Sequence, residues 1–361
     1  MSLRIRTTVG ALTIGVLVAV PAAAHAAVKT VYMGPPAAAE KVLNEKLNAD
    51  VNDFFPHSIS VHVGEKVRFV PVGFHTVDMP ARGSTPLPLI SPTGSAVANV
   101  LDAAGNPFWF NGRAQVGFNP LLGKGLFGTT AVYTTRTRVD SGLPLSNHPK
   151  SFNVRFTKAG TYTYYCNVHP GMKGVVHVRS ATSRVPTVAA DKLAVKRQIA
   201  SAEKAAKRIT ATVPPTGTVF VGGSAAHGVE SYAFYPSTVT VPVGTTLTFR
   251  MSPASLDVHT ATTGPGNPES EPASYLGTLA ATFEGGQVLD PRAVYPSDPA
   301  PLVPSLTPTA HGNGFWNAGM MDNSAATPLL NNSGTVRFDA AGTYQFYCLI
   351  HPFMHATVTV Q

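Results

Sequence analysis

Two copies of one short stretch contain the side chains whose types and spacing suggest chemistry. Each copy is a Gly-Thr-Tyr-x-aromatic-Tyr segment, typical of a β-strand, that runs into a Cys-x-x-His-x-x-Met turn. A thiolate, an imidazole and a thioether within seven residues form a soft metal-ligand set. These residues are Cys166, His169 and Met172 in the first copy and Cys348, His351 and Met354 in the second.

A further histidine recurs in both copies, well ahead of the turn. His75 and His259 each stand before a threonine at the end of a predicted strand, and no other histidine is shared by the two copies in this part of the chain. A metal ion held by the turn still lacks a second nitrogen donor. We therefore predict that His75 completes the first ligand set and that His259 completes the second.

Two histidines, one cysteine and a weak axial methionine are the ligands of a blue-copper electron-transfer site. The thiolate suits Cu(I) and the imidazoles suit Cu(II). Zinc is disfavoured because a thioether is not among its usual protein ligands. A disulfide between Cys166 and Cys348, the chain's two cysteines, is disfavoured because it would remove the thiolate from both ligand sets.

The strands that must position these ligands also repeat. Residues 55–69 and 235–249 each show strand, tight Val-Gly turn and strand, with apolar side chains at every second position. Gly and Pro are frequent, 32 and 31 residues, and only 13% of residues are charged, which favours many short strands over helix bundles. Further strand pairs are predicted at 31–34 and 219–222, 151–156 and 334–338, and 174–178 and 356–360.

Long insertions separate each His-Thr pair from its Cys turn. Both contain a Gly-Asn-x-Phe-Trp landmark, at 105–109 and 312–316, which we interpret as equivalent positions of the two copies. The Pro-, Gly- and Ser-rich residues 264–308 are interpreted as long surface loops. A helix is predicted over 37–54, where apolar residues recur at helical spacing.

The domain organisation follows from these repeats. Residues 1–26 resemble a signal peptide, with Arg4 and Arg6 ahead of an apolar run and cleavage expected near Ala26. We predict one domain at 27–180 and a second at 217–361. Residues 181–216 form a basic linker, with a helix at 188–209 whose narrow apolar stripe favours docking on a domain.

Both halves resemble the cupredoxins, the plastocyanin, azurin and amicyanin family. The aromatic strand before each cysteine carries the resemblance, and Cys-x-x-His-Pro-Phe-Met in the second copy is similar to the amicyanin loop. The resemblance implies an all-β chain of two Greek-key β-sandwiches with long loop insertions, joined by the helical linker. It implies one type 1 copper per domain, and electron passage through the turn histidine. The family ligands correspond to His75, Cys166, His169 and Met172, and to His259, Cys348, His351 and Met354.

Copper enzymes and copper carriers are the competing interpretations. A nitrite reductase or two-domain oxidase needs a second kind of copper site, commonly marked by His-x-His, and the sequence contains no such pair. Copper storage or delivery could draw on additional donors at Met320, Met321, His311 and His355. Two complete ligand sets favour an electron carrier, not an enzyme, that works with redox partner proteins.

The net charge and the leader indicate which partners and which location to expect. The formal net charge of +8 falls to +6 without Arg4 and Arg6, and no basic-aromatic pattern for nucleic acid accompanies it. The surplus favours acidic partners or the cell surface. No segment after the leader is long and apolar enough to span a membrane. We expect a secreted or periplasmic protein.

Overall fold

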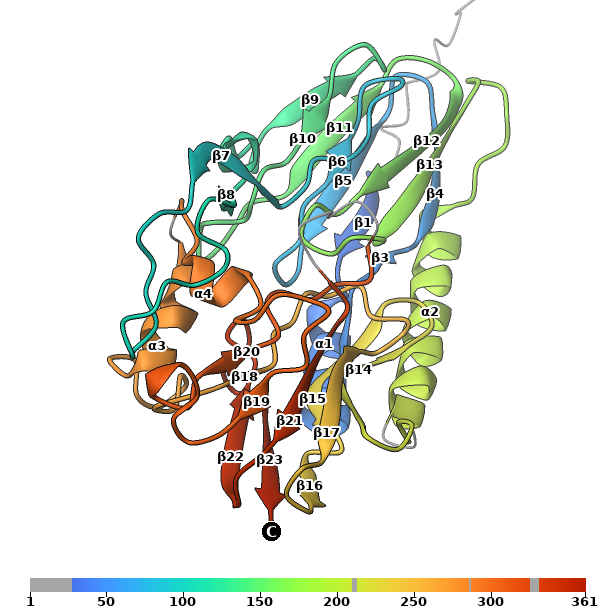
Figure 1. The fold of residues 1–361 in the computed structure, drawn as a ribbon. Coiled ribbons are helices and arrows are strands. Elements are labelled where there is room, and N and C mark those ends of the chain that lie inside the picture. The colour runs from blue at the N-terminus through green and yellow to red at the C-terminus, as the bar shows by residue number, and fades with distance from the viewer. Residues whose placement is uncertain (1–27, 210–212, 286, 325–330) are drawn as a thin grey trace, which may run out of the picture.

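The chain folds into two β-sandwiches that repeat one strand order (Figure 1). The computed structural model describes residues 28–209, 213–285, 287–324 and 331–361. The leader prediction at 1–26 lies outside these residues. None of the helices in the described ranges combines the length and apolar composition needed to cross a membrane.

The first sandwich consists of two five-stranded sheets, in the orders β3-β1-β5-β11-β9 and β10-β6-β12-β13-β4. Parallel pairing of β1 with β5 and of β13 with β4 brings the start of the domain beside its later strands. The strands are β1 (Lys29–Met33), β3 (Phe54–Phe55), β4 (Ser58–His62), β5 (Lys66–Pro71), β6 (Asp78–Met79), β9 (Thr130–Tyr133), β10 (Val139–Asp140), β11 (Phe152–Phe156), β12 (Gly160–Tyr165) and β13 (Lys173–Arg179).

The second sandwich repeats this arrangement in the orders β19-β21-β17-β14-β15 and β16-β23-β22-β18-β20. Each of the parallel pairs recurs, as β14 with β17 and β16 with β23. The strands are β14 (Thr218–Ala225), β15 (Val229–Tyr235), β16 (Thr238–Val241), β17 (Thr246–Met251), β18 (Thr262–Thr263), β19 (Ser305–Leu306), β20 (Trp316–Asn317), β21 (Ser333–Phe338), β22 (Gly342–Tyr347) and β23 (His355–Val360).

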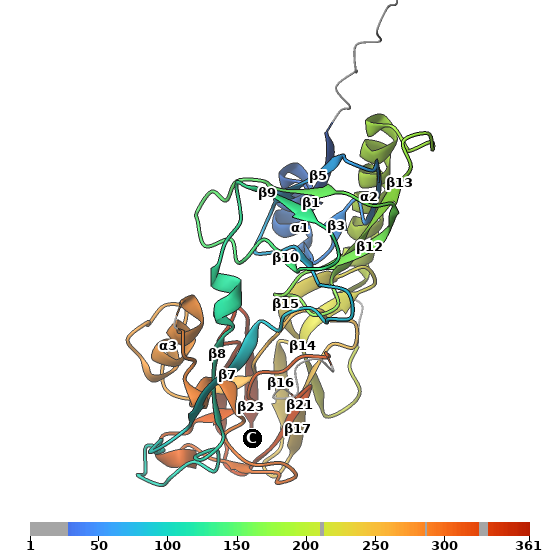
Figure 2. The same ribbon diagram turned by 90° about the horizontal axis from the view of Figure 1, so that it is seen from above.

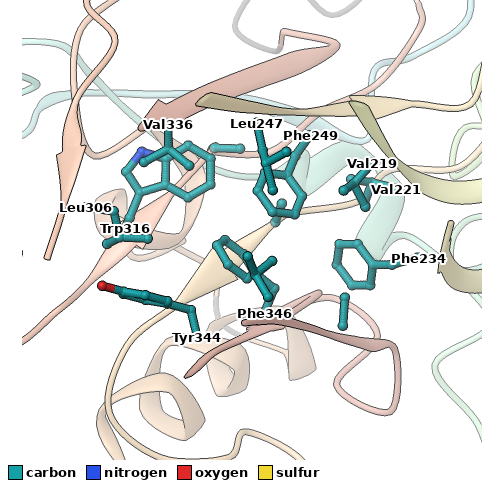
Figure 3. Close-up of a cluster of buried hydrophobic side chains, with 14 of the residues drawn as sticks. Val219, Val221, Phe234, Leu247, Phe249, Leu306, Trp316, Val336, Tyr344 and Phe346 are labelled. Carbon is teal, nitrogen blue, oxygen red and sulfur yellow. The ribbon is translucent and has the colours of Figure 1, made fainter. Parts of the chain in front are cut away.

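Apolar side chains at every second strand position fill the space between the two sheets of each sandwich. In β5, for example, Val67 and Phe69 are buried while their neighbours Lys66 and Arg68 are exposed. The core of the second sandwich is drawn in Figure 3, where Phe249 stacks on Phe346 with ring centroids 4.3 Å apart. The fold class predicted from the sequence, all-β with two sandwiches, is confirmed.

Helix α2 (Val188–Ile209) runs along one side of both sandwiches (Figure 1). Its apolar stripe packs with α1 (Ala37–Leu47) and with Phe55 and Val229, one from each domain. Helix α1 is shorter than the predicted 37–54. It ends at Leu47 because Asn48 adopts a left-handed conformation, after which the chain becomes extended.

Part of that extended chain joins the other domain. Strand β2 (Asp50–Val51) pairs with β15, so that Asp50 lies opposite Glu230 and Val51 opposite Val229. The sheet of the second sandwich thus has a sixth strand that comes from the first domain.

The insertions form one structured body. Residues 264–308 contribute short helices and buried apolar residues to it, so the interpretation of these residues as long surface loops was wrong for part of their length. Hairpin β7–β8 lies beside α3 and α4 in both Figure 1 and Figure 2. Phe110 and Val116 of the first insertion are buried with Leu276, Val294 and other apolar residues of the second. The elements are β7 (Ile90–Ala96), β8 (Ala114–Phe118), η1 (Pro120–Gly123), α3 (Tyr275–Ala280), η2 (Ala281–Glu284), α4 (Pro291–Val294) and η3 (Ala310–Gly312).

The two tryptophans are not equivalent, contrary to the sequence interpretation. Trp316 lies in β20 and packs in the core of the second sandwich. Trp109 lies in the inserted body, where its indole N–H donates to the carbonyl oxygen of Pro296. The counterpart of β20 by strand order is β10, which contains Val139. The shared Gly-Asn-x-Phe-Trp motif therefore occupies two different structural positions.

Candidate metal centres

The first centre brings three of its four predicted donors to one point. The Nδ1 atoms of His75 and His169 lie 3.0 Å apart. Cys166 Sγ lies 3.9 Å from Nδ1 of His75 and 3.6 Å from Nδ1 of His169. All three residues are buried. Met172 is also buried, in the same core cluster as Cys166.

The second centre has nearly the same dimensions. The Nδ1 atoms of His259 and His351 lie 3.2 Å apart, and Cys348 Sγ lies 3.7 Å from each. Met354 is buried in the core cluster that contains Cys348. Both cysteines are free. Among the described residues, these two trios are the groups of three or more histidine, cysteine or acidic donors close enough to share an ion.

Each turn is held by two backbone hydrogen bonds that recur in the same register. The N–H of Cys166 donates to the carbonyl oxygen of Met172, and the N–H of Met172 donates to that of His169, each at 3.0 Å. In the second turn, Cys348 and Met354 make the corresponding bonds at 3.0 and 2.8 Å. The backbone between paired strands β12–β13 and β22–β23 thus fixes where cysteine, histidine and methionine side chains begin.

The threonine after each remote histidine ties that segment to the cysteine. The Thr76 N–H donates to Cys166 Sγ at 3.5 Å, and the Thr260 N–H donates to Cys348 Sγ at 3.4 Å. The hydroxyl oxygen of Thr260 also accepts from the N–H of Leu349 at 2.8 Å. Hydrogen bonds to a ligating sulfur stabilise its negative charge and tune a metal bound to it.

A glycine backs each remote histidine on the side away from the thiol. Gly34 and Gly222 follow the opening strand segments Val31–Met33 and Val219–Val221, and both have positive φ, +103° and +77°. A Cβ at Gly222 would lie 2.7 Å from His259 Nε2, and one at Gly34 would lie 3.2 Å from His75 Nε2. The repeated glycine leaves room for an imidazole ring in each centre.

Burial and the neighbouring histidines shift the pKa values of the two thiols in opposite directions. Burial alone would raise the pKa of Cys166 and of Cys348, but hydrogen bonds with the two neighbouring histidines and their charge hold both pKa values well below the usual range. The thiolate is the form that binds a metal. Burial would also lower the pKa of His351, but Asp257 and the Cys348 thiolate raise it to about 9.

Asp257 is a component that the sequence analysis missed. It is 5% exposed, and its Oδ2 atom lies 3.9 Å from His351 Nε2. Burial would raise its pKa, yet His351, His259 and His169 together lower the pKa to about 2. Its position two residues before His259 was the available signal, but the first copy has glycine at the matching position, so the repeat did not mark it.

The donor sets fit a copper ion in size and chemistry. Metal bonds of about 2.0 Å to imidazole nitrogen and about 2.3 Å to thiolate, as known for zinc, place three evenly spread donors roughly 3.5–3.8 Å apart. The observed separations are 3.0–3.9 Å. Soft sulfur combined with imidazole matches copper better than the oxygen-preferring ions.

Comparison with known proteins agrees with this chemistry. Residues 96–179 match the family model of copper binding proteins of the plastocyanin/azurin family. The matched segment contains the first Cys-x-x-His-x-x-Met turn and ends with β13. The match thus lies within the first sandwich, and the second sandwich repeats the strand order and the donor set of the first.

Several solved cupredoxin structures are also similar to parts of the chain. Oxidised plastocyanin from Dryopteris crassirhizoma is 20% identical, with 40% of this chain and 99% of that chain covered and a TM-score of 0.20. A reduced Cu(I) form of an amicyanin mutant is 17% identical over 42% and 88%, with a TM-score of 0.21. A purple cupredoxin from Nitrosopumilus maritimus is 16% identical over 40% and 98%, with a TM-score of 0.20. No curated protein matches.

Proposed function

We propose that this chain is an exported electron carrier with one type 1 copper centre in each domain. The observation that carries the proposal is the repeated convergence of Cys166 with two imidazole Nδ1 atoms, and of Cys348 with two more, at 3.0–3.9 Å in a buried core. Copper bound there would supply a one-electron couple between Cu(I) and Cu(II).

The protein's own residues favour rapid electron exchange. Paired strands hold both ends of each ligand turn, and the threonine N–H fixes each sulfur, so the donors change position little between charge states. The buried apolar surround excludes water, which keeps solvent reorganisation small and tunes the potential. No bond needs to form or break in the chain when an electron enters or leaves.

Copper storage or delivery receives less support from the surroundings of the centres. His311 contacts Asp102 at 3.4 Å and Asp298 at 3.3 Å, and is thereby engaged in the inserted body. Met320 and Met321 are buried in apolar clusters. These three donors are thus engaged within the protein, and the fourth, His355, is exposed, with Nδ1 3.2 Å from the carbonyl oxygen of Phe353. Storage would need several such donors to take up and release ions together.

Export is proposed from the residues of the leader, and the partners are proposed from the net positive charge of the remaining chain. Redox partner proteins with acidic surfaces fit that charge. Comparing the N-terminus of the mature protein from the culture medium, the periplasm and the cytoplasm tests this part. Recovery of the chain from the cytoplasm with residues 1–26 retained would contradict it.

The copper assignment is tested by visible absorption of the oxidised, copper-loaded protein. We expect a strong thiolate-to-copper band to which both centres contribute. Cys166→Ser and Cys348→Ser should each remove one contribution, and the double variant should remove the band. Reversible bleaching by a one-electron reductant should accompany it.

Two outcomes would overturn the proposal. A colourless protein whose cysteines are joined to each other would contradict the copper centres themselves. Turnover of nitrite or of a phenol by the copper-loaded chain would instead assign it to the copper oxidoreductases.

A further inference from the structure

The two centres face a single cavity between the domains. This cavity, of about 300 Å³, is lined by His75 and His169 of the first centre and by His351 of the second. Asp257 and Tyr232 also line it. Ligand histidines of both centres therefore border the same cavity.

The outer edge of the His351 ring meets the cavity wall. In both centres the Nδ1 atoms point toward the thiol, which directs each Nε2 edge away from the donor trio. The Nε2 atom of His351 lies 3.9 Å from Asp257 Oδ2, on the cavity wall. Asp257 lines the cavity together with His169 of the first centre and His351 of the second. Imidazole rings extend from both ligand sets into one gap.

The two centres differ in their access to solvent. His75 and His169 are 2% and 6% exposed. The side chain of His351 is 20% exposed, and it belongs to an aromatic group with Tyr232 and Phe353, at ring-centroid distances of 4.7 and 6.1 Å. Phe353 is 52% exposed. A ligand histidine of the second centre is thus partly exposed, whereas both ligand histidines of the first centre are buried.

The contact between the domains fixes the width of the gap. A Cβ at Gly171, in the first ligand turn, would lie 2.8 Å from Leu256 Cδ2 of the second domain. Leu256 packs against the core of the first sandwich. The pairing of β2 with β15 and the shared core of the insertions hold the same interface at two further places. Ile90 and Phe283, one from each insertion, line the cavity and limit its access to water.

We propose that the two centres exchange electrons with each other across this cavity, and that the first centre communicates with outside partners by way of the second. The rate of electron tunnelling falls exponentially with the gap between redox groups, and the facing histidine edges shorten it. In one transfer, the reduced copper of one centre is oxidised and the oxidised copper of the other is reduced; no proton moves. The inference rests on the proposed copper centres.

The proximity of the centres is tested by pulsed dipolar EPR on the oxidised, copper-loaded chain. We expect a dipolar coupling between two Cu(II) ions in the wild type and none in Cys166→Ser or Cys348→Ser. Blue single-site variants combined with an uncoupled wild type would refute the facing arrangement and leave the copper centres standing. The absence of a blue band would refute the proposed function itself.

Exchange within one molecule is tested with centres that differ optically. The axial ligand tunes a blue-copper site, so Met172→Gln should shift the spectrum and potential of the first centre, and Met354→Gln those of the second. After a pulse that delivers less than one electron per molecule, the electron should redistribute in a first-order process. The rate should stay constant over a tenfold range of protein concentration. A rate proportional to concentration would mean that exchange occurs between molecules, contrary to the proposal.

The access route has its own test. In Cys348→Ser, reduction of the first centre by a small inorganic complex should slow at least tenfold relative to the wild type. Retention of the blue band by this variant reports that the first centre is intact. Reduction at the wild-type rate would show that the first centre is reached directly and would overturn the proposed route.

Discussion

Gly222→Ala is expected to disturb the second centre although Gly222 is not a ligand. The residue has φ +77°, and the added Cβ would lie 2.7 Å from Nε2 and 3.0 Å from Cδ2 of His259. The His259 ring cannot move away from this contact without changing the distance between its Nδ1 atom and Cys348 Sγ, which is 3.7 Å. We therefore expect the ring to turn or shift relative to the thiol.

The loss of folding stability expected for Gly222→Ala has two contributions. A left-handed conformation costs a non-glycine residue about 1–2 kcal/mol. Overpacking against a fixed neighbour adds about 1–3 kcal/mol. Gly244→Ala separates the two parts, because Gly244 has φ +87° but nothing lies within 4 Å of its Cβ position. Gly222→Ala should thus be about 1–3 kcal/mol less stable than Gly244→Ala.

Urea unfolding of the metal-free proteins measures this difference, and the visible spectrum of the copper-loaded proteins reports on the centre. We expect an altered absorption band and weaker copper binding in Gly222→Ala, with an unchanged band in Gly244→Ala. Gly34→Ala and Gly64→Ala give a related comparison in the first domain, although a Cβ at Gly34 would meet the Val72 carbonyl oxygen at 2.7 Å as well as His75 Nε2 at 3.2 Å. Equal stability losses and equal spectra within a pair would refute the idea that the glycine makes room for the ligand.

Three further variants test the surroundings of the centres. Burial, aided by the charge of Asp78, raises the pKa of Asp140 from 3.8 to about 7. The folded state therefore binds this proton more tightly, and its stability should fall as the pH rises from about 4 to 7, by about 4 kcal/mol in all. Asp140→Asn should flatten that part of the stability–pH curve measured by urea unfolding, and an unchanged curve would contradict the assignment. Phe110→Ala, at a fully buried position of the inserted body, should lower the unfolding free energy by about 3–5 kcal/mol. A loss below 1 kcal/mol would mean that this body contributes little. Gln198→Ala removes the side-chain bonds from α2 to Asp53 (2.9 Å) and to the Phe54 carbonyl (2.8 Å), and should cost about 1–3 kcal/mol in the same assay. Lys204→Ala, at an exposed position of the same helix, is the control, and an equal loss in both would contradict a specific role of these bonds.

The sequence predicted the donors of both centres because each ligand lies at the end of a strand with a recognisable period. The Val-Gly turns before β5 and β17 and the aromatic strands before Cys166 and Cys348 set the register of the repeat. The placement of His75 and His259 follows from that register. The local alternation of apolar residues was therefore sufficient to predict the positions of these histidines.

Other features depend on contacts that no local pattern contains. The Trp109 landmark matched Trp316 in letters, but one indole lies in the inserted body and the other in a sandwich core. Apolar residues of the insertions bury themselves against each other from distant parts of the chain, without helical or strand periodicity to indicate it. Because residues 264–308 show no such periodicity, their Gly- and Pro-rich composition led to the prediction of loops.

The relation between the two centres also depends on contacts between distant parts of the chain. The sequence repeat suggests two equal and separate domains, whereas an aromatic group of Tyr232 and Phe353 packs around His351 of the second centre. Strand β2 of the first domain completes a sheet of the second and lines the same cavity through Asp50. The pairing of β2 with β15 and the shared core of the insertions join the two domains beside the cavity that both turn histidines line. The segments that depart most from the repeat are therefore the ones on which the proposed electron exchange depends.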